Sequence, residues 1–231
     1  MTATPSEATP NDKAETEKSA RTISSVSAAF TLFCFTLVFT GLLAVAHRVT
    51  KPAIEASLAA EKQHFINEVL PAGHYDNNPI ADTLALPATP ELGQTSASHV
   101  FRARMKGKPA ALVLEAIAPD GYAGPIRIVL GITWDGTLTG VRVIEHKETP
   151  GLGDYVDLKR DKDKKYPWIL QFNGVSYPKT PDGDWKVRKD KGRFYYRTGA
   201  TISPRAVIAA VHRASRFVFE HRDALFQEQT P

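Results

Sequence analysis

Cysteine is almost absent from this chain of 231 residues, which contains only Cys34. A single cysteine excludes a disulfide within the chain. Because Cys34 lies inside an apolar run, we interpret its thiol as a small apolar side chain. The rest of the chain has to be stable without disulfides, which suits an exported or a cytosolic protein equally well. Cysteine content therefore leaves the compartment open.

The sequence also predicts no concentrated basic surface and shows no pattern of metal ligands. Its formal net charge is +4, and basic residues alternate with acids in the run KRDKDKK at residues 159–165. Such a run is typical of a solvated loop. The absence of a basic face with interleaved aromatic residues argues against nucleic-acid binding. His146, His212 and His221 are not arranged as metal ligands, so we predict no metal site.

Charged side chains are missing between Arg21 and His47. The apolar run Thr22–Ala46 would span about 37 Å as a helix, enough to cross a hydrocarbon core of about 30 Å. A signal peptide and a buried core helix are the alternatives. The length of the run favours a retained transmembrane helix, which we assign to residues 22–47. Positive charges on the two flanks nearly balance, so they do not fix the orientation.

The remaining residues divide into a tail, a connection and one main domain. Residues 1–21 have the composition of a disordered tail. Residues 48–98 are expected to hold a helix over Pro52–Leu70, because apolar residues recur there at helical spacing. An irregular connection rich in proline and small polar residues follows this helix. The main domain is expected over residues 99–222, with a second tail over 223–231.

Four segments of the main domain are rich in β-branched and aliphatic residues and are separated by turn sequences. These segments are Val100–Met105, Ala110–Ala118, Ile126–Trp134 and Leu138–Glu145. They predict an antiparallel meander. The residues that follow predict shorter strands, at Trp168–Phe172, Tyr177, Trp185–Lys189 and Arg193–Tyr196.

The end of the chain changes to helical spacing. Apolar residues recur there at Val207, Val211 and Val218. Ser203 fits the N-cap of this helix, and Pro204 fits its first position. The predicted fold class is therefore α+β: a single amino-terminal transmembrane helix is followed by a domain in which helices pack on one antiparallel sheet.

The segment Thr198-Gly199-Ala200-Thr201 stands directly before this last helix. Gly199 and Ala200 have little or no side chain, so a ligand can approach the backbone closely. Thr201 presents a hydroxyl near a helix N-terminus, where unsatisfied N–H groups and the helix dipole favour a phosphate. Arg205 can add a fixed positive charge. A turn that only feeds a helix explains the same four residues, so the segment alone does not decide the function.

A second candidate segment, HKETPGLGD at His146–Asp154, follows the last long strand. Its proline and two glycines predict a rigid loop whose backbone can approach a flat ligand closely. Glu148 and Thr149 offer polar contacts beside such a ligand. A conformationally demanding turn without a ligand explains the composition as well.

Four segments together resemble the RnfG family, the G subunits of the Rnf (also called Rsx) ion-translocating electron-transport complex. They are GYAGPIRIVLGI, HKETPGLGD, WILQF and TGATISPRAVIAAV, beginning at Gly121, His146, Trp168 and Thr198. Their order and separations match the family, and the similarity covers about residues 48–219. A chance match could explain one of these motifs, but it does not explain all four segments in the same order.

The resemblance implies an FMN-binding domain on the periplasmic face of a bacterial inner membrane, with residues 1–21 in the cytoplasm. It implies FMN that a flavin transferase has esterified, through its phosphate, to Thr201. The implied function is electron relay among the other subunits of a complex that couples ferredoxin:NAD oxidoreduction to ion transport, with no catalytic site in this chain. The further residues expected to line the phosphate or the ring are Thr198, Gly199, Ala200, Glu148, Thr149 and Leu152.

One departure from the family keeps other functions open. Members usually have an aspartate three residues before the first Ser/Thr of the flavin motif, where this chain has Tyr195. Flavin attachment is then slower, uses a different transferase or fails. One alternative is a flavoprotein similar to the NqrC family of the sodium-translocating NADH:quinone reductase, against which the PGLGD loop argues. The other is a flavin-free assembly subunit, which the missing aspartate favours.

Overall fold

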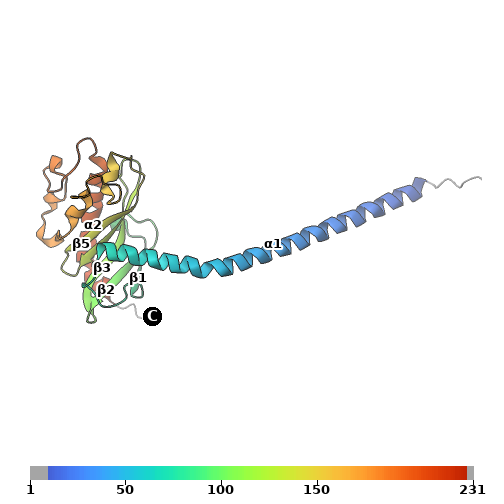
Figure 1. Cartoon of the computed structure of the whole chain (residues 1–231), viewed down its shortest axis with the longest axis horizontal. Coiled ribbons are helices and arrows are strands. Elements are labelled where there is room, and N and C mark those ends of the chain that lie inside the picture. The colour runs from blue at the N-terminus through green and yellow to red at the C-terminus, as the bar shows by residue number, and fades with distance from the viewer. Residues whose placement is uncertain (1–9, 228–231) are drawn as a thin grey trace, which may run out of the picture. The chain divides into compact units, whose positions relative to one another are not determined.

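The computed structural model describes residues 10–227, with side chains from residue 29 onward except those of residues 55, 58, 59 and 61. The chain divides into two compact units, Met1–Leu58 and Ala59–Pro231 (Figure 1). We call the second one the C-terminal unit. It begins within the last turns of the first helix.

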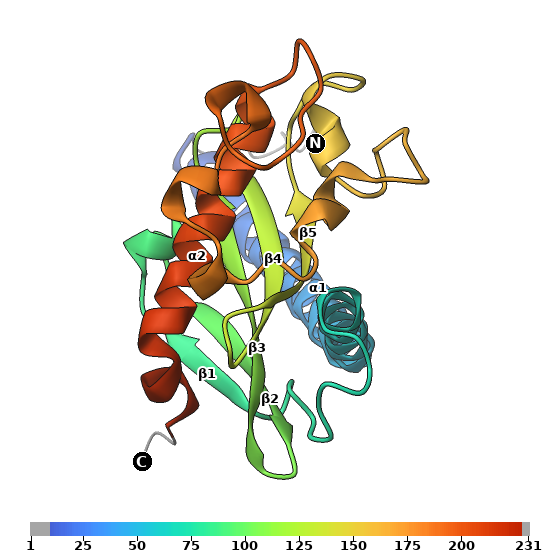
Figure 2. The same cartoon turned by 90° about the vertical axis from the view of Figure 1, so that its left-hand side faces the viewer.

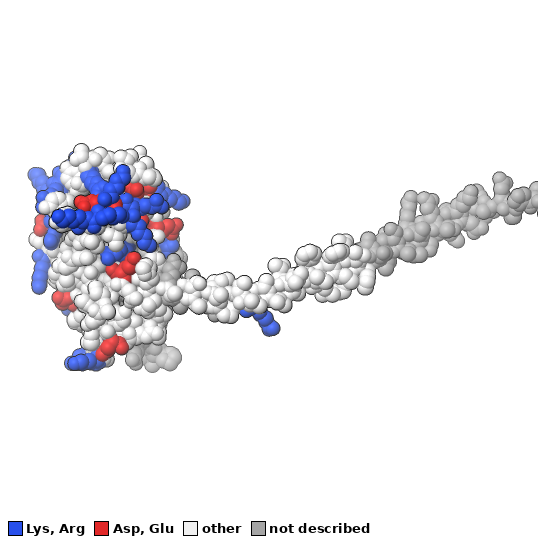
Figure 3. Space-filling model, in the orientation of Figure 1, with Lys and Arg blue, Asp and Glu red and all other residues white. Residues whose placement is uncertain are grey.

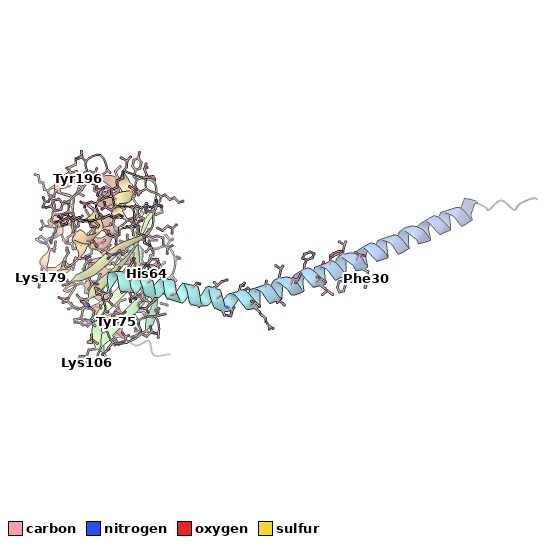
Figure 4. All side chains as sticks on the ribbon, in the orientation of Figure 1. Phe30, His64, Tyr75, Lys106, Lys179 and Tyr196 are labelled. Carbon is pink, nitrogen blue, oxygen red and sulfur yellow. The ribbon has the colours of Figure 1, made fainter. Side chains whose placement is uncertain are left out.

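The first helix, α1 (Pro10–Val69), forms the described part of the first unit and continues into the C-terminal unit. Within the described residues, Ala29–Ile54 is the one helical segment long and apolar enough to cross a membrane. Its large apolar side chains, among them Phe30 (Figure 4), are exposed. A helix satisfies its own backbone hydrogen bonds, so such a segment suits a hydrocarbon environment.

The start of α1 differs from the sequence prediction. The helix begins at Pro10, whereas the composition predicted a disordered tail through residue 21. Alanine, glutamate and lysine in this stretch are good helix formers, and a helix that is already nucleated extends at little cost. Residues 1–9 of the predicted tail lie outside the described residues. The helix predicted over Pro52–Leu70 is part of α1, with Pro52 inside it.

The C-terminal unit is built on a five-stranded antiparallel sheet with the order β1-β2-β3-β4-β5. The strands are β1 (Thr83–Leu86), β2 (Ser98–Met105), β3 (Lys108–Ala118), β4 (Ile126–Thr133) and β5 (Leu138–Glu145). Strands β2 to β5 confirm the predicted meander. Strand β1 lies in the segment predicted to be irregular, because four residues between prolines carry almost no periodic signal.

Alternate residues of the central strands face two different hydrophobic layers. On β3, Leu112 and Leu114 pack in the layer that includes α2 (Ile202–Phe226), which lies across one face of the sheet (Figure 2). Val113 packs in the other layer with Val69, at the end of α1. Side chains that alternate along a strand point to opposite faces, so helices cover both sides. The α+β fold class is confirmed.

The predicted short strands between residues 168 and 196 are wrong. This region consists of loops and short 3-10 helices, and similar turns flank the sheet elsewhere. The 3-10 helices are η1 (Pro90–Leu92), η2 (Gly153–Val156), η3 (Trp168–Phe172), η4 (Tyr177–Lys179), η5 (Asp182–Asp184) and η6 (Arg188–Asp190). Most of the aromatic residues that suggested strands are core residues instead, namely Trp168, Phe172, Trp185 and Phe194, whereas Tyr195 is exposed. Phe172 and Phe194, for example, have ring centroids 4.8 Å apart.

Candidate functional site

The loop after β5 begins with a tight turn. The Leu152 N–H donates to the Thr149 carbonyl at 3.1 Å, with Pro150 and Gly151 between them. Gly151 has a φ of +80°, which suits the third position of a type II turn, and proline suits the second. The turn leaves the Leu152 side chain exposed. The proline and first glycine of the motif thus have a defined conformational role.

The second glycine of this loop, Gly153, lies against the start of α2. A Cβ at this position would clash with the Ser203 hydroxyl and with the Glu148 carboxylate. Only glycine therefore allows the loop and the helix to approach this closely. The neighbouring Leu152 is exposed and lines the same pocket as Ile202 at the start of α2.

Glu148 ties three segments of the chain together. Its carboxylate accepts hydrogen bonds from the Ser203 hydroxyl and, at 3.1 Å, from the Ala123 N–H. Glu148 is 4% exposed, and a carboxylate buried to this degree requires donors that replace water. The loop before β4, the loop after β5 and the start of α2 are therefore held in one arrangement.

Tyr155 supports the Thr198–Thr201 segment. The Tyr155 hydroxyl donates to the Ala200 carbonyl at 2.8 Å and accepts from the Arg197 N–H at 3.2 Å. Burial raises the pKa of Tyr155, so its hydroxyl keeps the proton that it donates. The Ala200 N–H donates to the Arg197 carbonyl at 3.1 Å and closes a turn across the segment.

Thr201 is the N-cap residue of α2, but its hydroxyl does not cap the helix. Arg205 Nη1 instead donates to Thr201 Oγ1 at 3.2 Å. The prediction that Ser203 is the N-cap is wrong, because Ser203 lies inside α2 and its hydroxyl donates to Glu148. No side chain caps α2, so its first N–H groups remain able to bind an anion.

Arg205 is fixed by a bidentate ion pair with Asp190. Arg205 Nε lies 2.6 Å from Asp190 Oδ2, and Nη2 lies 2.8 Å from Oδ1. These hydrogen bonds lower the pKa of the Asp190 carboxyl and raise the pKa of the Arg205 guanidinium. The third nitrogen is directed at the Thr201 hydroxyl. The pair thus holds a permanent positive charge beside that hydroxyl.

These segments enclose a pocket of about 190 Å³. Six of the seven residues predicted from sequence to contact FMN line this pocket: Glu148, Thr149, Leu152, Gly199, Ala200 and Thr201. The seventh, Thr198, does not line it. The lining residues that the sequence reasoning did not assign are Tyr122, Gly153, Ile202 and Ser203. Tyr122 lies inside the GYAG segment of the resemblance, which was the available signal for it. We call this cavity the Thr201 pocket.

The histidines have structural partners. His146 Nδ1 accepts a hydrogen bond from the Glu148 N–H at 3.1 Å, and His212 stacks on Trp185 with ring centroids 4.9 Å apart. Burial lowers the pKa of His212. Among the residues that the structure describes, no group of three or more His, Cys, Asp or Glu side chains could hold a metal ion.

Residues 121–216 of the chain match the FMN-binding domain family. Every residue that lines the Thr201 pocket falls in this range. The crystal structure of Shewanella oneidensis NqrC superimposes with a TM-score of 0.50 at 18% identity and covers 73% of this chain and 99% of that one. At this identity the likeness concerns the fold. Residues 121–216 thus form a domain of the FMN-binding class, and the described residues include one candidate membrane helix.

The family within this class follows from further similarity. Residues 20–69 match the RnfG N-terminal region. The chain is 40% identical over 200 residues to the G subunit of the ion-translocating oxidoreductase complex of Vibrio cholerae serotype O1 (strain M66-2), covering 87% of this chain and 93% of the relative. The same protein of Erwinia tasmaniensis is 43% identical over 188 residues, covering 81% and 87%. The chain belongs to the RnfG family, the G subunits of the ion-translocating oxidoreductase complex.

Proposed function

We propose that this chain carries FMN covalently on Thr201 and relays electrons inside a membrane-bound ion-translocating oxidoreductase complex. The observation that carries the proposal is the state of the Thr201 hydroxyl. It stands at an uncapped helix N-terminus and contacts a guanidinium that Asp190 holds in place. A phosphate ester at this oxygen would meet both the helix N–H groups and Arg205.

The rim of the Thr201 pocket suits a flavin ring. Tyr122, Leu152 and Ile202 are exposed apolar side chains that line the pocket. Large apolar side chains gathered at a surface are typical of ligand or partner sites. The pocket of about 190 Å³ is smaller than the roughly 300–1,000 Å³ of sites that enclose a small ligand. A flavin ring here would remain partly exposed, as electron exchange with partner subunits requires.

A covalent link suits so shallow a pocket. Few non-covalent contacts are available to retain a cofactor, and a tether replaces affinity with a high effective concentration. FMN supplies the redox chemistry when bound, while this chain's residues position it and set its surroundings. No general acid or base in this chain is required, so the activity belongs to the whole complex.

We further propose how the chain is placed and matured. Ala29–Ile54 would anchor it in the bacterial inner membrane, with the C-terminal unit on the periplasmic side and the amino-terminal residues in the cytoplasm. Its partners are the other subunits of the complex, and a flavin transferase that modifies Thr201. Tyr195, at the position where family members usually have aspartate, does not line the Thr201 pocket.

Intact-mass measurement on the full-length chain from its native host tests the attachment. We expect the mass of the polypeptide plus one FMN minus water, and a fluorescent band in a denaturing gel. Thr201→Val removes both signals, whereas Thr95→Val, at an exposed threonine outside the motif and the pocket, retains them. A native chain with the bare polypeptide mass would refute the covalent flavin and favour the flavin-free assembly subunit.

A further inference from the structure

A second and larger pocket lies at the other end of the Tyr195–Thr201 segment. Its volume is about 590 Å³, within the range typical of small-molecule sites. Tyr195, Tyr196 and Arg197 form one wall, and residues of the 163–171 loop form the rest. Tyr196 marks this end of the C-terminal unit, opposite Lys106 (Figure 4). We call this cavity the Tyr195 pocket.

Exposed apolar side chains single out both pockets. In the described part of the C-terminal unit, five large apolar side chains are exposed. Tyr122, Leu152 and Ile202 line the Thr201 pocket, and Tyr166 and Tyr195, which are 71% and 59% exposed, line the Tyr195 pocket. Exposed apolar surface that gathers at a cavity is typical of a binding site. Exposed apolar side chains therefore gather at the Tyr195 pocket as they do at the Thr201 pocket.

A fixed cation stands in the wall of the Tyr195 pocket. Arg197 forms an ion pair with Asp161, whose side chain is fully buried, and its guanidinium lies 4.8 Å from the Tyr155 ring centroid. Asp161 also accepts the Trp168 N–H at 2.8 Å, which ties the two walls together. Arg197 is thus oriented without a ligand, while part of its side chain remains exposed. Preorganised donors of this kind bind anions at a low entropic cost.

The surroundings of the Tyr195 pocket are strongly basic, contrary to the sequence prediction of no concentrated basic surface, because the fold brings two basic segments together. Residues 159–165 and 186–197 together contain eleven Lys or Arg and three Asp, a net charge of +8, against +4 for the whole chain. Figure 3 shows the basic side chains gathered over the end of the unit where Tyr196 lies. A concentrated positive field raises the local concentration of anions and speeds their association. The ligand of this pocket should therefore be negatively charged.

We propose that the Tyr195 pocket binds a planar aromatic anion, a ring that carries a phosphate or carboxylate. The ring stacks among Tyr166, Tyr195 and Tyr196, and the anionic group pairs with Arg197 and Lys165. The Arg188 guanidinium lies over the Tyr195 ring, 3.6 Å from its centroid, so only one face of that ring is available for stacking. A mononucleotide combines these two features. Its sources are an adenine nucleotide or a free flavin nucleotide. The site is separate from Thr201 and does not depend on whether Thr201 carries FMN.

Calorimetric titration of the full-length chain in detergent with AMP, FMN and inorganic phosphate tests this site. The titrations use both the unsubstituted chain and Thr201→Val, so that failure of covalent attachment does not affect the result. We expect AMP or FMN to bind with one-to-one stoichiometry, and phosphate alone to bind at least about tenfold more weakly because it lacks the ring. Binding of AMP but not FMN identifies an adenine nucleotide, and the reverse identifies a second flavin.

Variants locate the binding. Tyr195→Ala should weaken it about tenfold or more through lost stacking. Lys165→Gln on the exposed rim should weaken it severalfold and reduce its salt dependence, whereas Lys106→Gln at the opposite end should do neither. Any of the following results would overturn the proposal: no nucleotide binds at millimolar concentration, Tyr195→Ala binds as well as the parent chain, or Tyr122→Ala abolishes binding, which would place the ligand in the Thr201 pocket. Equal affinity for phosphate alone would also overturn it.

Discussion

Removal of the Glu148 carboxylate should destabilise the C-terminal unit far more than removal of an exposed one. Glu148→Ala leaves the Ser203 hydroxyl and the Ala123 N–H without their acceptor, and Ser203 is buried. A buried donor left unsatisfied costs about 1–3 kcal/mol, and the exposed Ala123 N–H can bind water instead, so we expect a loss of about 1–3 kcal/mol. Glu148→Gln keeps the shape of the side chain and one carbonyl oxygen as an acceptor, and should lower the free energy of unfolding by about 1–2 kcal/mol.

Urea unfolding of the full-length protein in detergent measures these losses. Trp134, Trp168 and Trp185 all lie in the C-terminal unit, so tryptophan fluorescence reports on that unit alone. Glu145→Ala is the control, because Glu145 is exposed and its ion pair with Arg127 should be worth less than about 1 kcal/mol.

A double-mutant cycle with Ser203→Ala isolates the contact between Glu148 and Ser203. We expect a coupling free energy of about 1.5–3 kcal/mol, the range for a hydrogen bond to a charged group. A coupling below about 0.5 kcal/mol, or equal losses for Glu148→Ala and Glu145→Ala, would refute the reasoning that Glu148 joins the three segments of the Thr201 pocket.

Three further predictions concern the supports of the Thr201 pocket. Tyr155→Phe should lower the free energy of unfolding in urea by about 1–3 kcal/mol. Folding raises the pKa of Tyr155, so the stability difference between the parent chain and Tyr155→Phe is complete below the ordinary pKa of about 10 and shrinks as the pH rises through the raised value. Gly153→Ala should cost about 1–3 kcal/mol through its clash, whereas Gly183→Ala, which meets nothing within 4 Å, should leave the unfolding midpoint unchanged. Asp190→Asn should release Arg205 and slow FMN attachment severalfold, measured by intact mass over time. The pKa of Asp190 is lowered, so the ion pair between Asp190 and Arg205 persists until the pH falls below the ordinary pKa of the carboxyl. Protonation of Asp190 should therefore not slow FMN attachment between pH 8 and pH 5.

The sheet could be predicted because its strands repeat a simple pattern. On β3 and β4, apolar residues occupy both faces, and turn sequences mark each end, so strand positions follow from composition. The region from Trp168 to Tyr196 could not be predicted in this way. Trp168, Phe172, Trp185 and Phe194 are buried there, but they reach the core from 3-10 turns and loops whose spacing is set by tertiary packing.

The Thr201 pocket was predictable only in part. Nothing in the spacing shows that Glu148 and Thr201 come together, and their pairing in one pocket was expected only from the resemblance to a family. Ser203 was misassigned because its side chain has two possible partners: the helix N–H groups favour a cap, while a buried carboxylate from a distant loop binds it more strongly. Such a choice depends on the three-dimensional neighbours, which local sequence does not reveal.

The Thr201 pocket is held in shape by contacts that involve no cofactor. Glu148 fixes the start of α2, Tyr155 fixes the segment before it, and Asp190 fixes Arg205. A preorganised acceptor does not have to order itself when a phosphate is attached. Tyr195 contributes to none of these contacts and lines the neighbouring pocket. On the proposed function, an effect of Tyr195 on flavin attachment would therefore arise from recognition of the segment by the proposed transferase and not from the contacts that hold Thr201.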